Sequence, residues 1–122
     1  MTNEQIDELL AEIGRAPLIT SEEERMLLKA VKEKGTDCDE MKRLEQANMR
    51  FVVSLANQYQ HCGLSLEELI EVGKAGLRKA VENYDLDSNT KFITYAVTQM
   101  RQTLEQASTE KDRQDIAEGK KA

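Results

Sequence analysis

The chain has 122 residues, of which 33% are charged and 39% hydrophobic, and its formal net charge is −6. This length supports one domain with a single hydrophobic core. One Pro, six Gly and no Trp argue against a strand-and-turn architecture and favour charged amphipathic helices. An acidic chain repels nucleic acid at long range, so DNA binding would require a local basic or aromatic patch.

Several function classes are excluded by what the sequence lacks. The acidic N-terminus is no signal peptide, and no apolar run is long enough to predict a membrane span. Cys38 and Cys62 have no metal-ligand spacing and His61 is the single histidine, so we expect no metal and no cofactor. Two isolated thiols in a non-secreted chain are typical of a cytoplasmic protein. Nucleophilic catalysis needs a thiol, a base and an orienting group in contact, and adjacent side chains such as those of His61 and Cys62 rarely meet that geometry. We therefore interpret them as a surface pair and expect neither enzymatic activity nor a small-molecule substrate.

The first predicted helix runs from about residue 3 to 13 and ends at Gly14, before Pro17. Thr2 and Gln5 have the spacing of a capping box at its start. Its apolar face is formed by Ile6, Leu9, Leu10 and Ile13.

The second helix has the clearest start signal in the sequence. Thr20 is the predicted cap, Glu23 stands three residues later, and Gly35 ends the helix. The predicted apolar stripe consists of Met26, Leu27, Ala30 and Val31.

A long third helix is predicted over residues 39–60. Its stripe is wide, which implies burial against more than one neighbour. The stripe contains Met41, Leu44, Ala47, Phe51, Leu55 and Tyr59, widened by Val52 and Ala56.

The fourth helix is predicted to follow a second capping box, Ser65 with Glu68, and to run to about residue 83. Gly73 and Gly76 lie inside it, and each costs about 1 kcal/mol of helix propensity. We therefore expect a neighbouring helix to approach the backbone closely there. The predicted core residues are Leu66, Leu69, Ile70, Leu77, Ala80 and Val81.

After a polar loop over residues 85–90, a fifth helix is predicted over 91–107, and the polar tail 108–122 is expected to fray. The fold class is all-α, a compact bundle of about five helices. We predict a single domain over 1–107, with an N-terminal helical pair (1–35) and three core helices (39–107). The apolar face of the last helix comprises Phe92, Ala96, Met100, Leu104 and Ala107.

Three stretches resemble bacterial sigma factors of the sigma-70 family, from region 1.2 through region 2. They are IGRAPLITSEEE (13–24), LEQANMRFVVSLANQYQHCGLSLEELIEVGKAGLRKAVENYD (44–85) and KFITYAVTQMRQTLEQA (91–107). The resemblance implies a helix pair that grips the clamp helices of the largest subunit of core RNA polymerase. It also implies a last helix that melts and reads the −10 promoter element.

The resemblance implies a polymerase-binding surface on the fourth helix. Carboxylates there would face clamp arginines, with which they can form bidentate hydrogen bonds. We expect two consecutive helices, joined at residues 61–64, to present a ridge that bears carboxylates. Glycines in this ridge would leave room for a helical hairpin of the partner. The alternative is that these acids form an ordinary solvated helix face. At Glu71-Val72, Lys74 and Arg78 the chain departs from the usual family residues. The predicted contacts are Leu64, Glu67, Glu68, Glu71, Lys74 and Arg78.

On the DNA side, Thr98 and Gln99 replace the tryptophans that the family stacks against the melted strand. Aromatic stacking returns about 1–3 kcal/mol per base, so promoter melting is expected to be weakened. Gln102 matches a base-reading position, whereas Glu105 places an acid near the phosphates. Phe92 and Tyr95 can alternatively be core anchors. The predicted DNA contacts are Tyr84, Lys91, Phe92, Tyr95, Arg101 and Gln102.

Three functions remain open at this point. The first is a sigma-like domain that binds core polymerase and takes part in transcription initiation. The second is a decoy or regulator that occupies the clamp site without reading DNA, and the third is a helical interaction module for another partner. The family's C-terminal region is absent from the sequence, which is that of a one-domain protein or of a piece of a longer one.

Overall fold

A computed structural model describes residues 3–15, 19–60 and 63–117, and within these ranges all regular structure is helical. This confirms the predicted all-α fold class. None of the helices in the described ranges is long and apolar enough to cross a membrane. The helices are α1 (Asn3–Arg15), α2 (Ser21–Lys34), α3 (Asp39–Asn57), α4 (Leu66–Asn83) and α5 (Phe92–Ala117).

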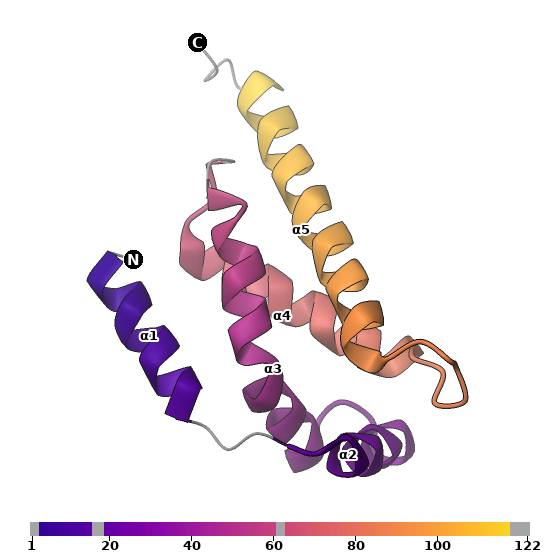
Figure 1. Ribbon diagram of the computed structural model, residues 1–122. Coiled ribbons are helices and arrows are strands. Elements are labelled where there is room, and N and C mark those ends of the chain that lie inside the picture. Colours follow the sequence, from indigo (N-terminus) through magenta and orange to yellow (C-terminus); the bar gives the residue numbers. More distant parts are fainter. Residues whose placement is uncertain (1–2, 16–18, 61–62, 118–122) are drawn as a thin grey trace.

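The helices α3, α4 and α5 form the centre of the domain, and α4 packs against both of the others. In Figure 1, α1 lies alongside α3 on the side away from α5, and α2 lies across the lower end of α3. The core is built mainly from α3, α4 and α5, while α2 adds Leu28 and Val31. Leu9 and Ile13 of α1 are only partly buried against this core.

Both capping boxes predicted inside the described ranges are present. The Thr20 hydroxyl accepts a hydrogen bond from the Glu23 backbone N–H at 3.1 Å, and the Ser65 hydroxyl accepts one from the Glu68 N–H at 3.1 Å. Each hydroxyl also donates to the carboxylate of its glutamate. These bonds satisfy backbone donors that the first helical turn leaves unpaired, and they fix where α2 and α4 begin. The predicted Thr2 cap and Pro17 lie outside the described residues.

The close helix approach predicted from the two glycines of α4 is also confirmed. A Cβ atom on Gly76 would lie 2.8 Å from the Met100 Cα and 2.9 Å from the Thr103 Oγ1, both on α5. A Cβ atom on Gly73 would lie 3.1 Å from the Val52 Cγ1 of α3. The absence of side chains at these two positions therefore lets α4 sit tightly against both neighbours.

Three residues predicted on apolar helix faces are exposed, and Leu10 of α1, at 37%, is the least exposed of them. Met26 is 71% exposed, because Leu28 faces the core and a residue two positions away in a helix points almost the opposite way. Phe51 is 42% exposed, because the buried line of α3 passes through Asn48 and Val52 instead. The rest of the predicted α3 stripe is largely correct, since Met41, Leu44, Val52, Leu55 and Ala56 are buried, and Val31 of the predicted α2 stripe is buried too.

Three predicted helix ends also differ from the structure. The helix α1 runs through the predicted stop at Gly14 and ends at Arg15. The α-helix α3 ends at Asn57 rather than at residue 60, since the Gln58 and Tyr59 N–H groups bond three residues back and tighten the last turn. The helix α5 does not end at residue 107 but continues to Ala117. No Gly or Pro lies between Gly76 and Gly119 to stop it, and the residues after 107 are mostly good helix formers.

Candidate functional site

The predicted docking carboxylates lie on the outer face of α4. Glu67, Glu68 and Glu71 are all exposed, and the Glu71 side chain retains 74% of its accessible surface. The Ser65 cap fixes the first turn, and carboxylates there are stabilised by the positive end of the helix dipole. The helix dipole alone accounts for the presence of acids at positions 67 and 68, so no binding partner is needed to explain them. Glu71 lies one turn further along and is not explained in this way.

The two cations predicted beside these acids are already paired within the domain. The Lys74 Nζ lies 3.5 Å from the Glu71 carboxylate. The Arg78 Nε donates a 2.6 Å hydrogen bond to Glu45 of α3, a carboxylate whose side chain is only 12% exposed. This hydrogen bond raises the pKa of the Arg78 guanidinium above its ordinary value. Arg78 therefore ties α4 to α3, and part of its charge is neutralised internally.

The predicted ridge is only partly correct. Gly73 and Gly76 are buried and face α3 and α5, so they are wrong as part of an outward docking surface. The two glycines permit close contacts of α4 with α3 and α5, and these contacts lie inside the domain. The carboxylates occupy the other side of the same helix and remain accessible. Leu64, which precedes α4, is partly buried against the core.

On the DNA side, two of the predicted aromatic contacts are core residues. Tyr84 is 8% exposed and Phe92 is 2% exposed, and their rings meet edge to face with centroids 5.3 Å apart. The Tyr84 hydroxyl donates a 2.5 Å hydrogen bond to the Thr90 carbonyl, which closes the loop between α4 and α5. Both rings pack the base of α5, which agrees with the core-anchor alternative for Phe92 and places Tyr84 in the core as well. DNA contact by these two residues stays a prediction.

The other four predicted DNA contacts are at least partly accessible. Tyr95 is partly buried, with its ring centroid 5.7 Å from that of Tyr84, whereas Lys91 and Gln102 are exposed. Arg101 is exposed as well, and its Nη1 donates a 3.2 Å hydrogen bond to the Gln58 Oε1 at the end of α3. One turn further along α5, Glu105 accepts a 3.3 Å hydrogen bond from the Tyr59 hydroxyl. This face thus carries cations and an acid side by side.

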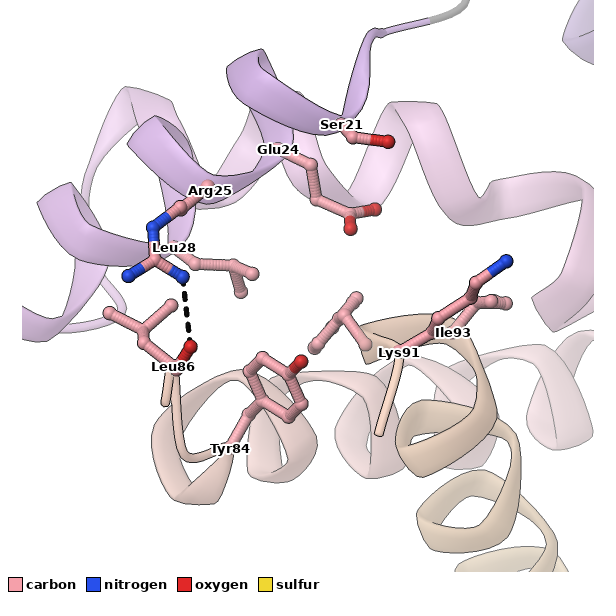
Figure 2. A pocket seen from close by; sticks show the side chains of 9 residues that line it. Ser21, Glu24, Arg25, Leu28, Tyr84, Leu86, Lys91 and Ile93 are labelled. Atoms are coloured by element: carbon pink, nitrogen blue, oxygen red, sulfur yellow. Dashed lines mark hydrogen bonds between the residues drawn. The ribbon is translucent and has the colours of Figure 1, made fainter. Parts of the chain in front are cut away.

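A cavity of about 370 Å³ lies between α2 and the loop that joins α4 to α5 (Figure 2). The Arg25 Nη1 closes one end of it by donating a 2.8 Å hydrogen bond to the Leu86 carbonyl, and Nη2 lies 3.9 Å from the Asp87 carboxylate. Sequence reasoning missed this link, because residues 61 positions apart give no local signal. The lining residues are Ser21, Glu24, Arg25, Leu28, Tyr84, Leu86, Lys91, Phe92 and Ile93.

Glu24 is the acidic residue among those that line this cavity. Figure 2 shows its carboxylate extending from α2 into the space between α2 and the loop. Burial removes water from the carboxylate and raises the pKa of Glu24 above its ordinary value. Three predicted DNA contacts, Tyr84, Lys91 and Phe92, line the same cavity, so the structure brings them together around an acid.

Within the part of the chain that the structure describes, no group of three His, Cys, Asp or Glu side chains could hold a metal ion. His61 and Cys62 lie outside the described residues. The two faces described above offer exposed charges and hydrogen-bonding groups on rigid helices. Such surfaces are suited to binding a macromolecule.

Comparison with known proteins agrees with this architecture. Residues 44–114 match the family model described as Sigma-70 region 2, which covers more than half of the chain. The chain belongs to the sigma-70 region 2 family, as the resemblance of its motifs predicted.

Three similar proteins carry the name RNA polymerase sigma factor SigA. That of Listeria monocytogenes is 40% identical over 111 residues, which is 91% of this chain and 29% of the relative. That of Lactococcus lactis subsp. cremoris is 39% identical over 118 residues, or 93% of this chain and 32% of the relative. That of a Bacillus species is 38% identical over 111 residues, with 91% and 29% covered. The chain thus spans about a third of the length of the relatives it matches.

Proposed function

We propose that the chain binds core RNA polymerase through the outer face of α4 and takes part in transcription initiation. The observation that carries this proposal is the row of exposed carboxylates, Glu67, Glu68 and Glu71, in a domain of the sigma-70 region 2 family. The partner surface is the pair of arginine-bearing clamp helices of the largest subunit. Carboxylates opposite arginines can form bidentate, charge-assisted hydrogen bonds. The proposed role is binding, without catalysis.

The proposed polymerase contacts extend from the loop before α4 to its middle. Leu64 contributes apolar surface next to the Ser65 cap, and the acids follow in the first two turns. The acidic surface ends at Lys74 and Arg78. Each of these cations forms an ion pair with a carboxylate of the domain itself. We therefore assign the attraction for the clamp arginines to the acids. Arg78, which pairs with Glu45, contributes to the orientation of α4 on α3, whereas Lys74 pairs within α4 itself.

On the DNA side we propose weakened reading and melting of the −10 element. Support comes from the burial of Tyr84 and Phe92 and from Thr98 and Gln99 at the positions of the stacking tryptophans. Unstacking a base costs a few kcal/mol, and among the aromatic residues predicted to contact DNA, Tyr95 is the one with accessible surface to offset that cost. The proposed DNA contacts with accessible surface are Lys91, Tyr95, Arg101 and Gln102.

A second function is favoured by the same observations, namely a regulator that occupies the clamp site without reading DNA. Arg101 is engaged by Gln58, and Glu105 places an acid on the same helix. Binding of a −10 non-template single strand to the polymerase complex separates the two functions. Strand capture favours initiation, whereas polymerase binding without strand capture favours the regulator.

The proposed function is tested by co-purification with core RNA polymerase. We expect the wild-type chain to bind and Glu71→Arg to bind about tenfold more weakly or worse, since a like charge would then face the clamp arginines. Glu33→Arg, the same charge reversal at an exposed position of α2, is the matched control and should bind as wild type does. Failure of the wild type to bind, or equal binding by Glu71→Arg, contradicts the proposal and favours an interaction module for another partner.

A further inference from the structure

A groove lies where α1, α3 and α4 meet. It consists of two hollows of about 400 Å³ each, and the two share Leu9 of α1 and Met49 of α3 as lining residues. The two hollows therefore adjoin each other at these two residues. The first hollow is completed by Glu12, Ile13 and Gln46, and the second by Glu67, Ile70, Glu71 and Lys74.

The floor of the groove is apolar and incompletely covered. Leu9, Ile13 and Met49 are partly buried, and each packs against the hydrophobic core on one side. Ile70 of α4 is buried at the bottom of the second hollow. A partly covered apolar floor in a concave site is the kind of place where an interface accepts a large apolar side chain.

The rim of the groove is acidic on both walls. Glu12 stands on the α1 wall, and Glu67 and Glu71 stand on the α4 wall, all of them exposed. Lys74 is the one cation among the lining residues described, and it is paired with Glu71 at 3.5 Å. The charge of the rim therefore complements a partner with Arg or Lys side chains on both sides of an apolar residue.

We propose that α1 forms the second wall of the polymerase-docking surface and that the groove receives an apolar side chain of the basic partner helices. This inference rests on the proposed function, because Glu67 and Glu71 belong to the groove and to the proposed docking face alike. It changes the docking surface from one charged helix face to a two-walled groove. The contact then has an apolar centre surrounded by charge, the arrangement in which interface side chains contribute most to affinity.

The fold explains why this groove stays open. Gly73 and Gly76 bring α4 against α3 and α5, so the opposite side of α4 faces away from the core. The helix α1 packs mainly on α3 and contacts this side of α4 only at its edge. In Figure 1, α1 and the first turns of α4 lie on the same side of α3.

The test compares variants of α1 and of the groove floor for binding to purified core RNA polymerase. Glu12→Lys reverses a rim charge at an exposed position, and Met49→Gln makes the floor polar at similar side-chain size. We expect each to weaken binding about tenfold, without a change in the thermal midpoint for Glu12→Lys. Asp7→Lys is the control, because Asp7 is exposed and lies two residues before Leu9, on the other face of α1.

The outcomes separate this inference from the proposed function. If Glu71→Arg loses binding while Glu12→Lys and Met49→Gln bind normally, α1 is no part of the interface and only the inference is overturned. If Asp7→Lys weakens binding as much as Glu12→Lys, the effect is one of total charge, and the inference is overturned too. If the wild-type chain does not bind polymerase, both are overturned.

Discussion

The residues predicted to bind a partner differ in burial between two regions of the domain. One region is the outer face of α4 (the α4 side), and the other is α5 with the end of α4 that leads into it (the α5 side). On the α4 side, the predicted carboxylates Glu67, Glu68 and Glu71 all lie on the surface. On the α5 side, Tyr84 and Phe92 are in the core, and only Tyr95 of the predicted aromatic contacts keeps part of its surface.

The difference follows from the chemistry of the side chains. Burying an ionised carboxylate without a partner costs free energy, which keeps Glu67, Glu68 and Glu71 at the surface and raises the pKa of the half-buried Glu24. An aromatic ring gains free energy by burial in the protein as well as by stacking on a base. Helical periodicity does not distinguish these two uses. A family motif therefore indicates function more reliably at charged positions than at aromatic ones.

The largest expected effect concerns the contact that holds the two sides together. In Gly76→Ala the new Cβ would meet the Met100 backbone and the Thr103 hydroxyl at less than 3 Å, so α5 must shift. Overpacking of this kind costs about 1–3 kcal/mol, more than the roughly 1 kcal/mol that Ala gains in helix propensity. We expect a lower free energy of unfolding in urea titrations followed by circular dichroism.

Gly73→Ala is the matched control on the same helix. Its Cβ would meet only the Val52 side chain at 3.1 Å, which can move by a few tenths of an ångström. We expect its free energy of unfolding to stay within about 1 kcal/mol of wild type, since the propensity gain offsets the contact. Equal losses in the two variants would contradict the view that α5 is the tighter neighbour of α4.

A smaller effect tests whether the aromatic residues of the α5 side are structural. Tyr84→Phe removes the hydroxyl that bonds to the Thr90 carbonyl, and we expect a loss of about 1 kcal/mol in the free energy of unfolding. Tyr95→Phe is the control, because within the described residues the Tyr95 hydroxyl makes no hydrogen bond. The opposite ranking of the two variants would mean that the Tyr84 hydroxyl does not stabilise the loop through the Thr90 carbonyl.

The starts of helices could be predicted from sequence because capping is local. The Thr20 and Ser65 caps need only a glutamate three residues on, and both form as predicted. The end of α5 could not be placed in this way. Its last ten residues carry no apolar stripe, and the helix continues because nothing in the sequence stops it.

The rotation of a helix about its axis was harder to predict than its bounds. Met26 and Phe51 fit an apolar stripe as well as Leu28 and Val52 do, and only the neighbouring helices decide between them. Asn48 is buried although it is polar, because its Nδ2 donates a 2.8 Å hydrogen bond to the Leu44 carbonyl within its own helix.

The sequence predicts a close helix approach at Gly73 and Gly76, but it does not predict which side chains pair across distant segments. The Arg78–Glu45 pair spans 33 positions and the Arg25–Leu86 hydrogen bond spans 61. Both pairs unite residues whose own neighbours in sequence give no hint of a partner. The groove between α1 and α4 is of the same kind, since Leu9, Met49 and Ile70 come from three helices.

The smallest expected effect contrasts a carboxylate of the cavity with those of the surface. Desolvation raises the pKa of Glu24 above its ordinary value of 4.5, so the folded state holds this proton more tightly than the unfolded state does. Stability from this group is therefore present at low pH and is lost as the pH rises through the raised pKa. At neutral pH the ionised Glu24 is a small cost to the fold.

Glu24→Gln removes that cost, and we expect it to raise the thermal midpoint slightly at pH 7, by less than about 0.5 kcal/mol in stability. The gain should shrink towards zero as the pH is lowered below 4.5, where wild-type Glu24 is protonated in both states. Glu22→Gln is the matched control, because it loses the same kind of interaction with the helix dipole as Glu24→Gln but relieves no desolvation, so it should be the less stable of the two variants at pH 7. A gain for Glu24→Gln that persists unchanged at low pH would show that packing, rather than desolvation of the carboxylate, sets the difference between the cavity and the surface.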